Sequence, residues 1–221
     1  MATYLITGAS RGIGYEYCRQ LQARGEAVIA VCRTASQELQ QLGVQVEDGI
    51  DITSDDSITN LRNRLGDTAI DVLVNNAGIL KRVTLEDLDF DSIREQFEVN
   101  ALGALRVTHA LLPNLRTGSK IVLMTSRMGS IGDNTSGSSY GYRMSKVALS
   151  MAGKSLAHDL KPRGITVAIL HPGLVQTQMT NFTKGGITPE ESVQGLLARI
   201  DELTLENTGT FWHANGAVLP W

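Results

Sequence analysis

A tyrosine and a lysine stand four residues apart in the segment SSYGYRMSKVAL, at Tyr142 and Lys146. On an α-helix this spacing puts both side chains on one face, about one turn apart. A nearby ammonium stabilises a phenolate, so the pair is expected to lower the pKa of Tyr142 from its ordinary value of about 10. A tyrosine with such a pKa can donate or accept a proton. Tyr140 would lie about 200° away on the same helix and is expected at a loop edge instead.

Two serines upstream of this pair can supply a hydroxyl to the same chemistry. Ser126 closes the apolar run IVLMTS, where a predicted strand ends, whereas Ser130 lies further into the following loop. A strand end holds a side chain more rigidly than a loop does, so Ser126 is preferred as the residue that polarises a carbonyl oxygen. Ser130 is the alternative. Serine, tyrosine and lysine would then form one acid/base unit.

A glycine-rich segment, TGASRGIG, follows the first predicted strand and opens the first predicted helix. Glycine lets the backbone approach a ligand closely, and a helix start offers free N–H groups and a positive dipole end to a pyrophosphate. The segment therefore predicts a dinucleotide site. The residues assigned to it are Gly8, Ser10, Arg11, Gly12, Ile13 and Gly14.

The end of the second predicted strand bears on which dinucleotide binds. An NAD enzyme of this architecture usually carries an acid there for the ribose 2′-hydroxyl, but the stretch VCRTAS offers Arg33 and no acid before Glu38. Arg33 and Arg11 can converge on a 2′-phosphate, which planar guanidinium groups bind well. The pattern favours NADP(H). The alternative is that both are ordinary solvated arginines.

The next two strand ends carry further candidates. Asp51 can accept a hydrogen bond from an adenine amino group while Ile52 packs on the ring, although Asp51 serves a turn equally well. The fourth strand is followed by NNAG, where Asn76, Ala77 and Gly78 are expected to hold a loop against the cofactor ribose.

The elements that must position these residues follow from apolar periodicity. Several short runs are apolar on both faces, as parallel strands covered by helices must be, and they alternate with amphipathic segments. The sequence thus predicts an α/β fold with a doubly wound parallel sheet and helices on both faces. Strands are expected at Thr3–Thr7, Ala27–Cys32, Val44–Val46, Ile70–Val74, Lys120–Thr125, Thr166–Leu170 and Thr210–Trp212. Helices are expected at Gly12–Arg24, Ser36–Leu42, Ser54–Leu65, Phe90–Leu115, Tyr142–Leu160 and Pro189–Ile200.

Composition narrows the class of protein. The 221 residues, 42% hydrophobic and 19% charged, suit one domain spanning residues 1–221. A net charge of −3 with scattered lysines and arginines argues against nucleic acid as a partner. Neither a membrane-spanning segment nor a secretion signal is expected. No metal site is expected either, because the two cysteines and four histidines show no ligand spacing. The cysteines suit a reduced, cytoplasmic setting.

Taken together in chain order, these motifs resemble the short-chain dehydrogenases/reductases. The resemblance covers nearly the whole chain: the TGxxxGxG loop, NNAG, Asn100 in VNALG, a serine after strand five, YxxxK, and Pro172-Gly173 after strand six. Within that family the segment SRMGSIGDN and the ending NGAVLPW are similar to small C-factor-like and sniffer-like carbonyl reductases. The distance from Ser126 to Tyr142 exceeds the commonest family spacing, and the extra residues are expected to shape the pocket mouth.

The resemblance implies a Rossmann fold and a role for each matching residue. Tyr142 would protonate the carbonyl oxygen, Lys146 would hold the nicotinamide ribose and lower the tyrosine pKa, and Ser126 would polarise the carbonyl. Asn100 would hold a water that links Lys146 to solvent. Pro172, Gly173, Val175 and Thr177 would contact the cofactor, the last two through its carboxamide.

Three functions are compatible with these residues. The preferred one is NADPH-dependent reduction of a ketone or aldehyde, reversible as alcohol oxidation, with a substrate loop at about 174–188. The pocket wall would include Met128, Met179 and Phe182, unless these simply pack. A cofactor-binding signalling protein is the alternative, and reduction of acyl-carrier-bound ketoacyl groups is a third. The two long predicted helices resemble family dimer contacts, so a homodimer or tetramer is expected.

Overall fold

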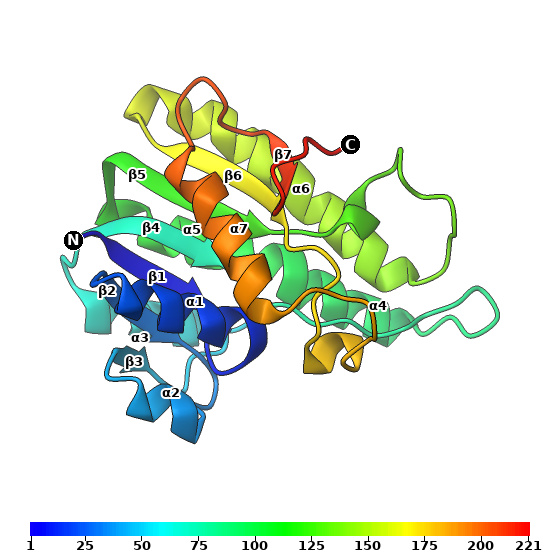
Figure 1. The fold of residues 1–221 in the computed structure, drawn as a ribbon, viewed down its shortest axis with the longest axis horizontal. Coiled ribbons are helices and arrows are strands. Elements are labelled where there is room, and N and C mark those ends of the chain that lie inside the picture. Colours follow the sequence, from blue (N-terminus) through cyan, green and yellow to red (C-terminus); the bar gives the residue numbers. More distant parts are fainter.

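The computed structural model contains one seven-stranded sheet with all strands parallel, in the order β3-β2-β1-β4-β5-β6-β7 (Figure 1). The chain winds outward from β1 to one edge, then returns to β4 and winds to the other edge. The strands are β1 Thr3–Thr7, β2 Ala27–Val31, β3 Gln45–Glu47, β4 Ile70–Asn75, β5 Leu115–Met124, β6 Thr166–His171 and β7 Phe211–His213. This confirms the predicted doubly wound fold.

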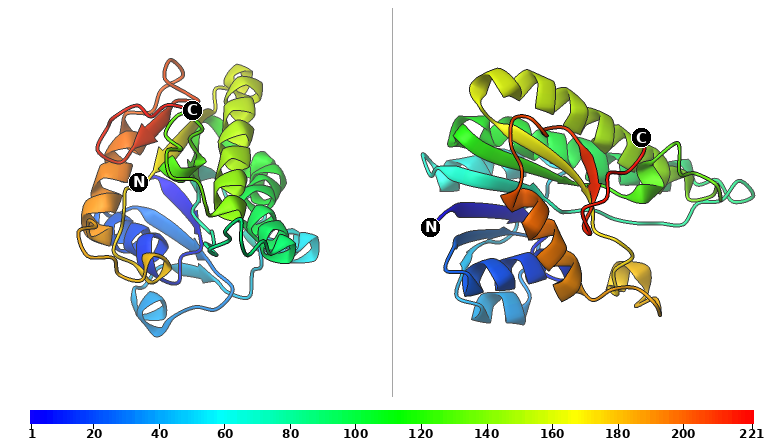
Figure 2. Two further views of the ribbon diagram at one scale, coloured as in Figure 1. Left: turned by 90° about the vertical axis from the view of Figure 1, so that its right-hand side faces the viewer. Right: turned by 45° about the horizontal axis from the view of Figure 1, so that its top comes forward.

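Helices cover both faces of the sheet, as the two views of Figure 2 also show. One layer holds α1 and α7, which pack against each other, and the other holds α3, α5 and α6. The α-helices are α1 Gly12–Ala23, α2 Gln37–Gln41, α3 Asp55–Leu65, α4 Phe90–Phe97, α5 Ala104–Leu111, α6 Tyr140–Leu160 and α7 Pro189–Asp201. No helix combines the length and apolar composition that crossing a membrane requires.

Strand side chains alternate between two hydrophobic cores. Tyr4 and Ile6 of β1 join the core under α1 and α7, whereas Leu5 joins the core under α3, α5 and α6. Each core contains 22 buried residues, so both faces of the sheet are shielded from solvent. Alternation of side chains along a strand explains why the runs are apolar on both faces. The sheet is therefore a rigid base for the loops at its strand ends.

The segment Phe90–Leu115, predicted as one helix, is divided. A π-helix at Glu98–Gly103 separates α4 from α5, and a 3₁₀ turn at Leu112–Asn114 contains Pro113. Proline has no N–H with which to continue a helix. Leu115 then pairs with Ile70 as the first residue of β5, five residues before the predicted strand start. Apolar periodicity alone missed both breaks: Pro113 marks the second one in the sequence, whereas the first accompanies hydrogen bonds between Asn100 and Ile79.

Helix α6 begins at Tyr140, two residues earlier than predicted. The three preceding residues, Gly137, Ser138 and Ser139, all have a left-handed backbone with φ of 63°, 59° and 51°. Tyr140 is the first residue of the helix and directly follows this loop, so it lies at the loop edge as predicted. It is 37% exposed, whereas Tyr142 is 7% exposed, as expected for side chains on different helix faces.

Candidate active site

The carboxyl ends of the parallel strands lie at one edge of the sheet, which faces the viewer in the left view of Figure 2. Ser126 follows β5 directly, and Tyr142 and Lys146 lie on the first turns of α6. The Lys146 ammonium is 5.7 Å from the centre of the Tyr142 ring, and the Ser126 hydroxyl lies near enough to the tyrosine phenol to act on its pKa. All three side chains are buried. The structure thus brings the predicted acid/base residues together.

The two candidate serines differ in what they contact. The Ser126 Oγ accepts a hydrogen bond from the Met128 N–H at 3.1 Å and neighbours the phenol of Tyr142. The Ser130 Oγ accepts one from the Asp133 N–H at 3.1 Å and stabilises a turn in the loop. Ser126 therefore remains the better candidate for polarising a carbonyl oxygen.

The ionisation of this site is governed by burial. Desolvation raises the pKa of Tyr142 to about 12, and the Ser126 hydrogen bond only partly opposes this. Desolvation also lowers the pKa of Lys146 to about 8. The expectation that the lysine lowers the pKa of Tyr142 is thus not met, because loss of water around the buried phenol is the largest cause of its shift.

Lys146 is held toward the NNAG loop. Its Nζ donates a hydrogen bond to the Met124 carbonyl at 2.8 Å. A Cβ added to Gly78 would lie 3.4 Å from this Nζ and 3.1 Å from Asn100 Oδ1. Gly78 therefore packs close to both side chains, and a larger residue at this position would press against Asn100.

Asn100 lies in the π-helix and is fully buried. Its Oδ1 accepts from the Ile79 N–H at 2.8 Å, and its Nδ2 donates to the Ile79 carbonyl at 2.9 Å and the Ser145 Oγ at 2.9 Å. The Ser145 hydroxyl in turn donates to the Tyr142 carbonyl at 2.8 Å. Asn100 thus links the loop after β4 to the helix that carries Tyr142. Ser145 was not among the predicted residues, although a polar residue inside YxxxK was a signal.

The glycine-rich segment packs tightly against the NNAG loop. Gly8 has a φ of 67°, and a Cβ there would lie 2.8 Å from the Ala77 Cα. A Cβ on Gly14 would lie 2.2 Å from the Gly8 carbonyl oxygen. The Thr7 hydroxyl accepts from the N–H groups of Asn76 and Ala77, both at 3.1 Å. Thr7 was missed, although it is a hydroxyl residue at the end of an apolar strand. Of the other residues assigned to the cradle, Gly12 begins α1, Ile13 packs against the core, and Ser10 is half-buried in the loop.

Arg11 and Arg33 have different surroundings. The Arg11 Nη1 donates to the Gln178 Oε1 at 2.7 Å, which ties the glycine loop to the loop after β6. Arg33 is exposed just beyond β2, and its charge contributes to lowering the pKa of Asp51. The structure therefore gives Arg11 a partner that the sequence analysis did not predict.

Asp51 and Ile52 follow β3. The Asp51 carboxylate accepts from the Thr53 N–H at 2.9 Å and the Thr53 hydroxyl at 2.8 Å, and these bonds are the main cause of its lowered pKa. This is the turn role that the sequence allowed. Ile52 is buried against Gly103, where a Cβ would lie 2.7 Å from the Ile52 Cδ1.

The loop after β6 is closed at its base. The Ile187 N–H donates to the Leu174 carbonyl at 2.8 Å, and the Gln176 N–H donates to the Ile187 carbonyl at 2.9 Å. Within it Val175 is buried, and Thr177 approaches the first helix: a Cβ on Gly12 would lie 3.5 Å from the Thr177 Cγ2. The Pro172 carbonyl accepts from the Ser192 hydroxyl, and Gly173 has a φ of 87°. The loop thus reaches over the glycine-rich segment.

Met128, Met179 and Phe182 remain candidates for the pocket wall. Met179 and Phe182 are exposed on the closed loop, and Met128 is half-buried at the start of the loop after β5. None of them belongs to a core cluster, so simple core packing does not account for them.

Two histidines that were assigned no role meet beneath the same loop. The rings of His171 and His213 lie edge to face at 5.0 Å, and a Cβ on Gly173 would be 3.5 Å from the His213 Cε1. Burial lowers the pKa of His171 to about 3, so it is neutral. Periodicity could not predict the pair, because the two residues come from different strands.

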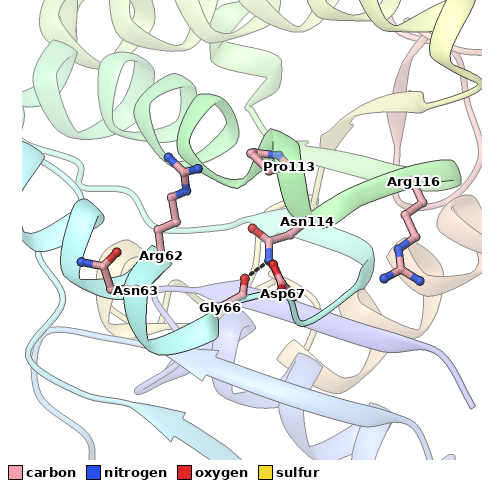
Figure 3. Close-up of a pocket in the computed structure, with 7 residues that line it drawn as sticks. All are labelled: Arg62, Asn63, Gly66, Asp67, Pro113, Asn114 and Arg116. Carbon is pink, nitrogen blue, oxygen red and sulfur yellow. Dashed lines mark hydrogen bonds between the residues drawn. The ribbon is translucent and has the colours of Figure 1, made fainter.

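A polar hollow lies at the opposite end of the sheet, where β4 and β5 begin (Figure 3). None of its lining residues is hydrophobic, and none was predicted to bind a ligand. The Asn114 amide donates to the carbonyls of Gly66 and Thr68, both at 2.8 Å, which is a structural role. The lining residues are Arg62, Asn63, Gly66, Asp67, Pro113, Asn114 and Arg116. This hollow is not a candidate for the acid/base chemistry.

Solved structures with the same fold include two carbonyl reductases. The NADPH-bound carbonyl reductase from chicken fatty liver superposes with a TM-score of 0.91 at 28% identity, covering 100% of this chain and 99% of that one. Carbonyl reductase Sniffer of D. melanogaster superposes with a TM-score of 0.91 at 28% identity, covering 100% of both chains.

Curated relatives are more similar in sequence. A 1-hydroxy-2-glutathionyl-2-methyl-3-butene dehydrogenase of Rhodococcus sp. (strain AD45) is 43% identical over the full length of both chains. The C-signal protein of Myxococcus xanthus is 45% identical over 69% of this chain and 93% of its own. These matches confirm the resemblance to C-factor-like and sniffer-like proteins. The model of the short chain dehydrogenase family matches residues 2–186, and the protein therefore belongs to that family.

Proposed function

We propose that the protein is an NADP(H)-dependent carbonyl reductase that converts a ketone or aldehyde to an alcohol and catalyses the reverse oxidation. The observation that carries this proposal is the buried set of Ser126, Tyr142 and Lys146, beside a glycine-rich loop. All of these residues are attached to one sheet. Residues 1–221 would therefore act as one dinucleotide-binding and catalytic domain, with residues 174–188 over the substrate.

The residues present suit a dinucleotide. Gly8 and Gly14 let two loops pack at distances that a Cβ would block, and Gly78 lets the NNAG loop lie close to Lys146 and Asn100. When bound, the nicotinamide supplies or accepts a hydride. The remaining cofactor residues of the proposal are Ser10, Arg11, Gly12, Ile13, Arg33, Asp51, Ile52, Asn76, Ala77, Pro172, Gly173, Val175 and Thr177.

The chain's own groups would handle the proton. Tyr142, protonated at neutral pH because burial raises its pKa, would donate its phenolic proton to the carbonyl oxygen during reduction. Ser126 would donate a hydrogen bond to the same oxygen. Lys146 would stabilise the resulting phenolate and hold the ribose, and the water expected near Asn100 would return a proton to this unit.

The preference for NADP(H) rests on charge. Arg33 lies just after β2 without a carboxylate at the position where an NAD enzyme usually has one. The chicken carbonyl reductase with a similar fold is NADPH-bound. We expect Arg33→Asp to shift the ratio of kcat/KM values for NADPH and NADH toward NADH by about 100-fold. The substitution removes a hydrogen-bond donor to the 2′-phosphate and adds a carboxylate that repels this phosphate. A wild-type enzyme that prefers NADH would contradict the assignment.

The decisive experiment is a substrate panel. Purified protein is assayed for NADPH oxidation with ketones, aldehydes and diketones, and for NADP⁺ reduction with alcohols. Because the Rhodococcus relative is named for a glutathionyl alcohol, a glutathione-conjugated alcohol belongs in the second set. Turnover that disappears in Tyr142→Phe supports the proposal, and inactivity with the whole panel contradicts it.

A second candidate is a cofactor-binding signalling protein, favoured by the similarity to C-signal. Such a protein needs cofactor binding but no acid/base unit. NADPH binding together with inactivity in the panel would favour this function over reduction.

Two further proposals concern assembly and location. A homodimer or tetramer would bury exposed apolar residues on the helical layer of α5 and α6, including Leu105, Met144 and Met151. Cys18 and Cys32 are both free and buried, which suits a reducing cytoplasm.

A further inference from the structure

The loop between β5 and α6, residues 127–139, has a strained end. Gly137, Ser138 and Ser139 form three successive left-handed residues, and serine rarely adopts this conformation. No side chain caps the helix that follows. Something else in the structure must stabilise the turn that leads into Tyr140 and Tyr142.

Arg143 supplies this stabilisation. Its Nε donates to the carbonyls of Gly137 at 3.0 Å and Ser138 at 3.1 Å. Its Nη1 donates to the Met128 carbonyl at 3.3 Å, and its Nη2 to the Ser136 hydroxyl at 2.9 Å. A planar guanidinium can serve several acceptors at once, which an ammonium on a flexible stem cannot do in the same geometry. Arg143 therefore joins the beginning of the loop to its end.

Arg143 makes no ion pair, although other arginines near the site do. Arg127, at the start of the same loop, pairs with Asp133 at 2.6 Å. Every partner of Arg143 is an uncharged oxygen of the loop. Its hydrogen bonds therefore stabilise the conformation of the loop and do not neutralise a carboxylate.

The loop is fixed at two further points. A Cβ on Gly129 would lie 2.8 Å from the Lys146 carbonyl carbon, so the beginning of the loop touches the helix that carries the lysine. The Gly132 N–H donates to the Trp221 carbonyl at 2.8 Å, and the Trp221 ring stacks on Phe211 at 5.5 Å. With both of these contacts in place, Arg143 holds the remaining segment from Ser136 to Ser138.

We propose that Arg143 is a positioning residue that holds loop 127–139 in shape, and that this loop limits the size of the substrate accepted beside Tyr142. This inference rests on the proposed reductase function, because it names what selects among the carbonyl substrates. Arg143 follows the proposed acid directly in sequence but points toward the loop, so it acts without touching the reacting atoms.

The test compares Arg143→Ala, Arg143→Lys and Ser136→Ala with the wild type. Amide hydrogen exchange reports on loop 127–139, and kcat and KM are measured for the smallest and bulkiest substrates of the panel. We expect both arginine variants to speed exchange in the loop by about tenfold or more, because each loses several hydrogen bonds. Ser136→Ala loses one and should lie in between. Arg94→Ala, which removes a surface pair with Asp91, is the control and should leave both readouts unchanged.

The kinetic pattern separates positioning from catalysis. In both arginine variants we expect the ratio of KM values for bulky and small substrates to change by about fivefold or more, while kcat for the small substrate stays within about threefold. Unchanged exchange in Arg143→Ala would overturn the proposal, as would wild-type behaviour of Arg143→Lys. Should Arg143→Ala fail to fold, Arg143→Lys provides the same test.

The exchange measurement does not depend on turnover. If the wild type reduces no carbonyl, the reductase function fails, yet faster loop exchange in the variants still supports Arg143 as the residue that shapes the loop. If the wild type is active and loop exchange is unaffected, only the inference on Arg143 fails.

Discussion

Tyr140 and Tyr142 lie two residues apart on the same helix and face different surroundings. Tyr142 is buried beside Ser126 and Lys146, whereas Tyr140 is partly exposed at the first turn of α6. We expect Tyr142→Phe to lower kcat by about 1000-fold or more, because no other group can supply the proton. Tyr140→Phe should change kcat by less than about threefold.

Binding of NADPH, followed by its fluorescence, is the control for this pair. Both variants should bind it with an affinity close to that of the wild type, since neither loses a contact to the phosphates. Equal losses of activity in the two variants would show that the acid has been assigned wrongly.

Lys146 is expected to reduce stability at neutral pH. Its pKa falls from about 10.5 in the unfolded chain to about 8 in the folded protein, because burial disfavours the ammonium. Between these values the unfolded chain binds the additional proton, so this contribution makes the protein more stable as pH rises from 8 toward 10.5. Below pH 8 the destabilisation is fully present.

Lys146→Met removes this dependence. Urea unfolding at several pH values should show that the advantage of the variant over the wild type is largest below pH 8 and shrinks above it. Comparing the two proteins cancels the contributions of Tyr142, Cys18 and Cys32, whose raised pKa values act in the opposite direction at high pH. A difference that is constant with pH would contradict the buried-ammonium account. Catalytic activity should be lost throughout.

The 3₁₀ turn Arg127–Gly129 sets Ser126 against α6. Gly129 permits this contact, because a Cβ there would lie 2.8 Å from the Lys146 carbonyl carbon and 2.9 Å from the Lys146 Cβ. Helix backbone cannot move away as a flexible side chain can. Gly129→Ala should therefore displace the turn and lower kcat/KM by about tenfold or more, with NADPH binding retained.

Gly43→Ala is the matched control. Gly43 has a φ of 76° and no atom near its added Cβ, so alanine there is strained but touches nothing. It should cost about 1 kcal/mol in the free energy of unfolding without affecting kcat/KM. If Gly129→Ala loses no more activity than Gly43→Ala, the close contact does not position Ser126.

Elements were predictable where periodicity alone determines them. Most strands between Thr3 and His171 follow runs that are apolar on both faces, with Gln45–Glu47 as the exception, and most of their boundaries were predicted within one or two residues. Of the two breaks in Phe90–Leu115, the one at Pro113 carried a local signal that the apolar periodicity did not capture, whereas the π-helix around Asn100 accompanies contacts with the distant Ile79. Local patterns carry no signal for such contacts.

The same division applies to the site. Ser126, Tyr142 and Lys146 were predicted together. Parallel strands bring their carboxyl ends to one edge of the sheet, and the four-residue spacing puts Tyr142 and Lys146 on one helix face. Arg143 was not recognised, because its four acceptors are mostly backbone carbonyls, which any sequence possesses. The pKa of Tyr142 was predicted in the wrong direction, because the sequence shows a neighbouring charge but not the loss of water around it.

The helical layer of α5 and α6 carries apolar side chains that the monomer leaves uncovered. Met144 and Met151 lie two turns apart on α6 and are 51% and 66% exposed, and Leu105 of α5 is 40% exposed. Residues seven apart share one helix face, so the two methionines form a single stripe. A second copy of this chain would bury this surface in a homodimer through a bundle of helices.

Replacing Leu105 and Met151 together by lysine would place four like charges in such a dimer interface, two from each subunit. We expect sedimentation velocity at micromolar concentration to show a dimer or tetramer for the wild type and a monomer for this variant, because burying unpaired charge is costly. Leu205→Lys is the control, since Leu205 is also 40% exposed but lies in the loop between α7 and β7. Its assembly should match that of the wild type. A wild type that sediments as a monomer, or a double variant that assembles like the wild type, would show that the exposed stripe on α5 and α6 is not a subunit interface.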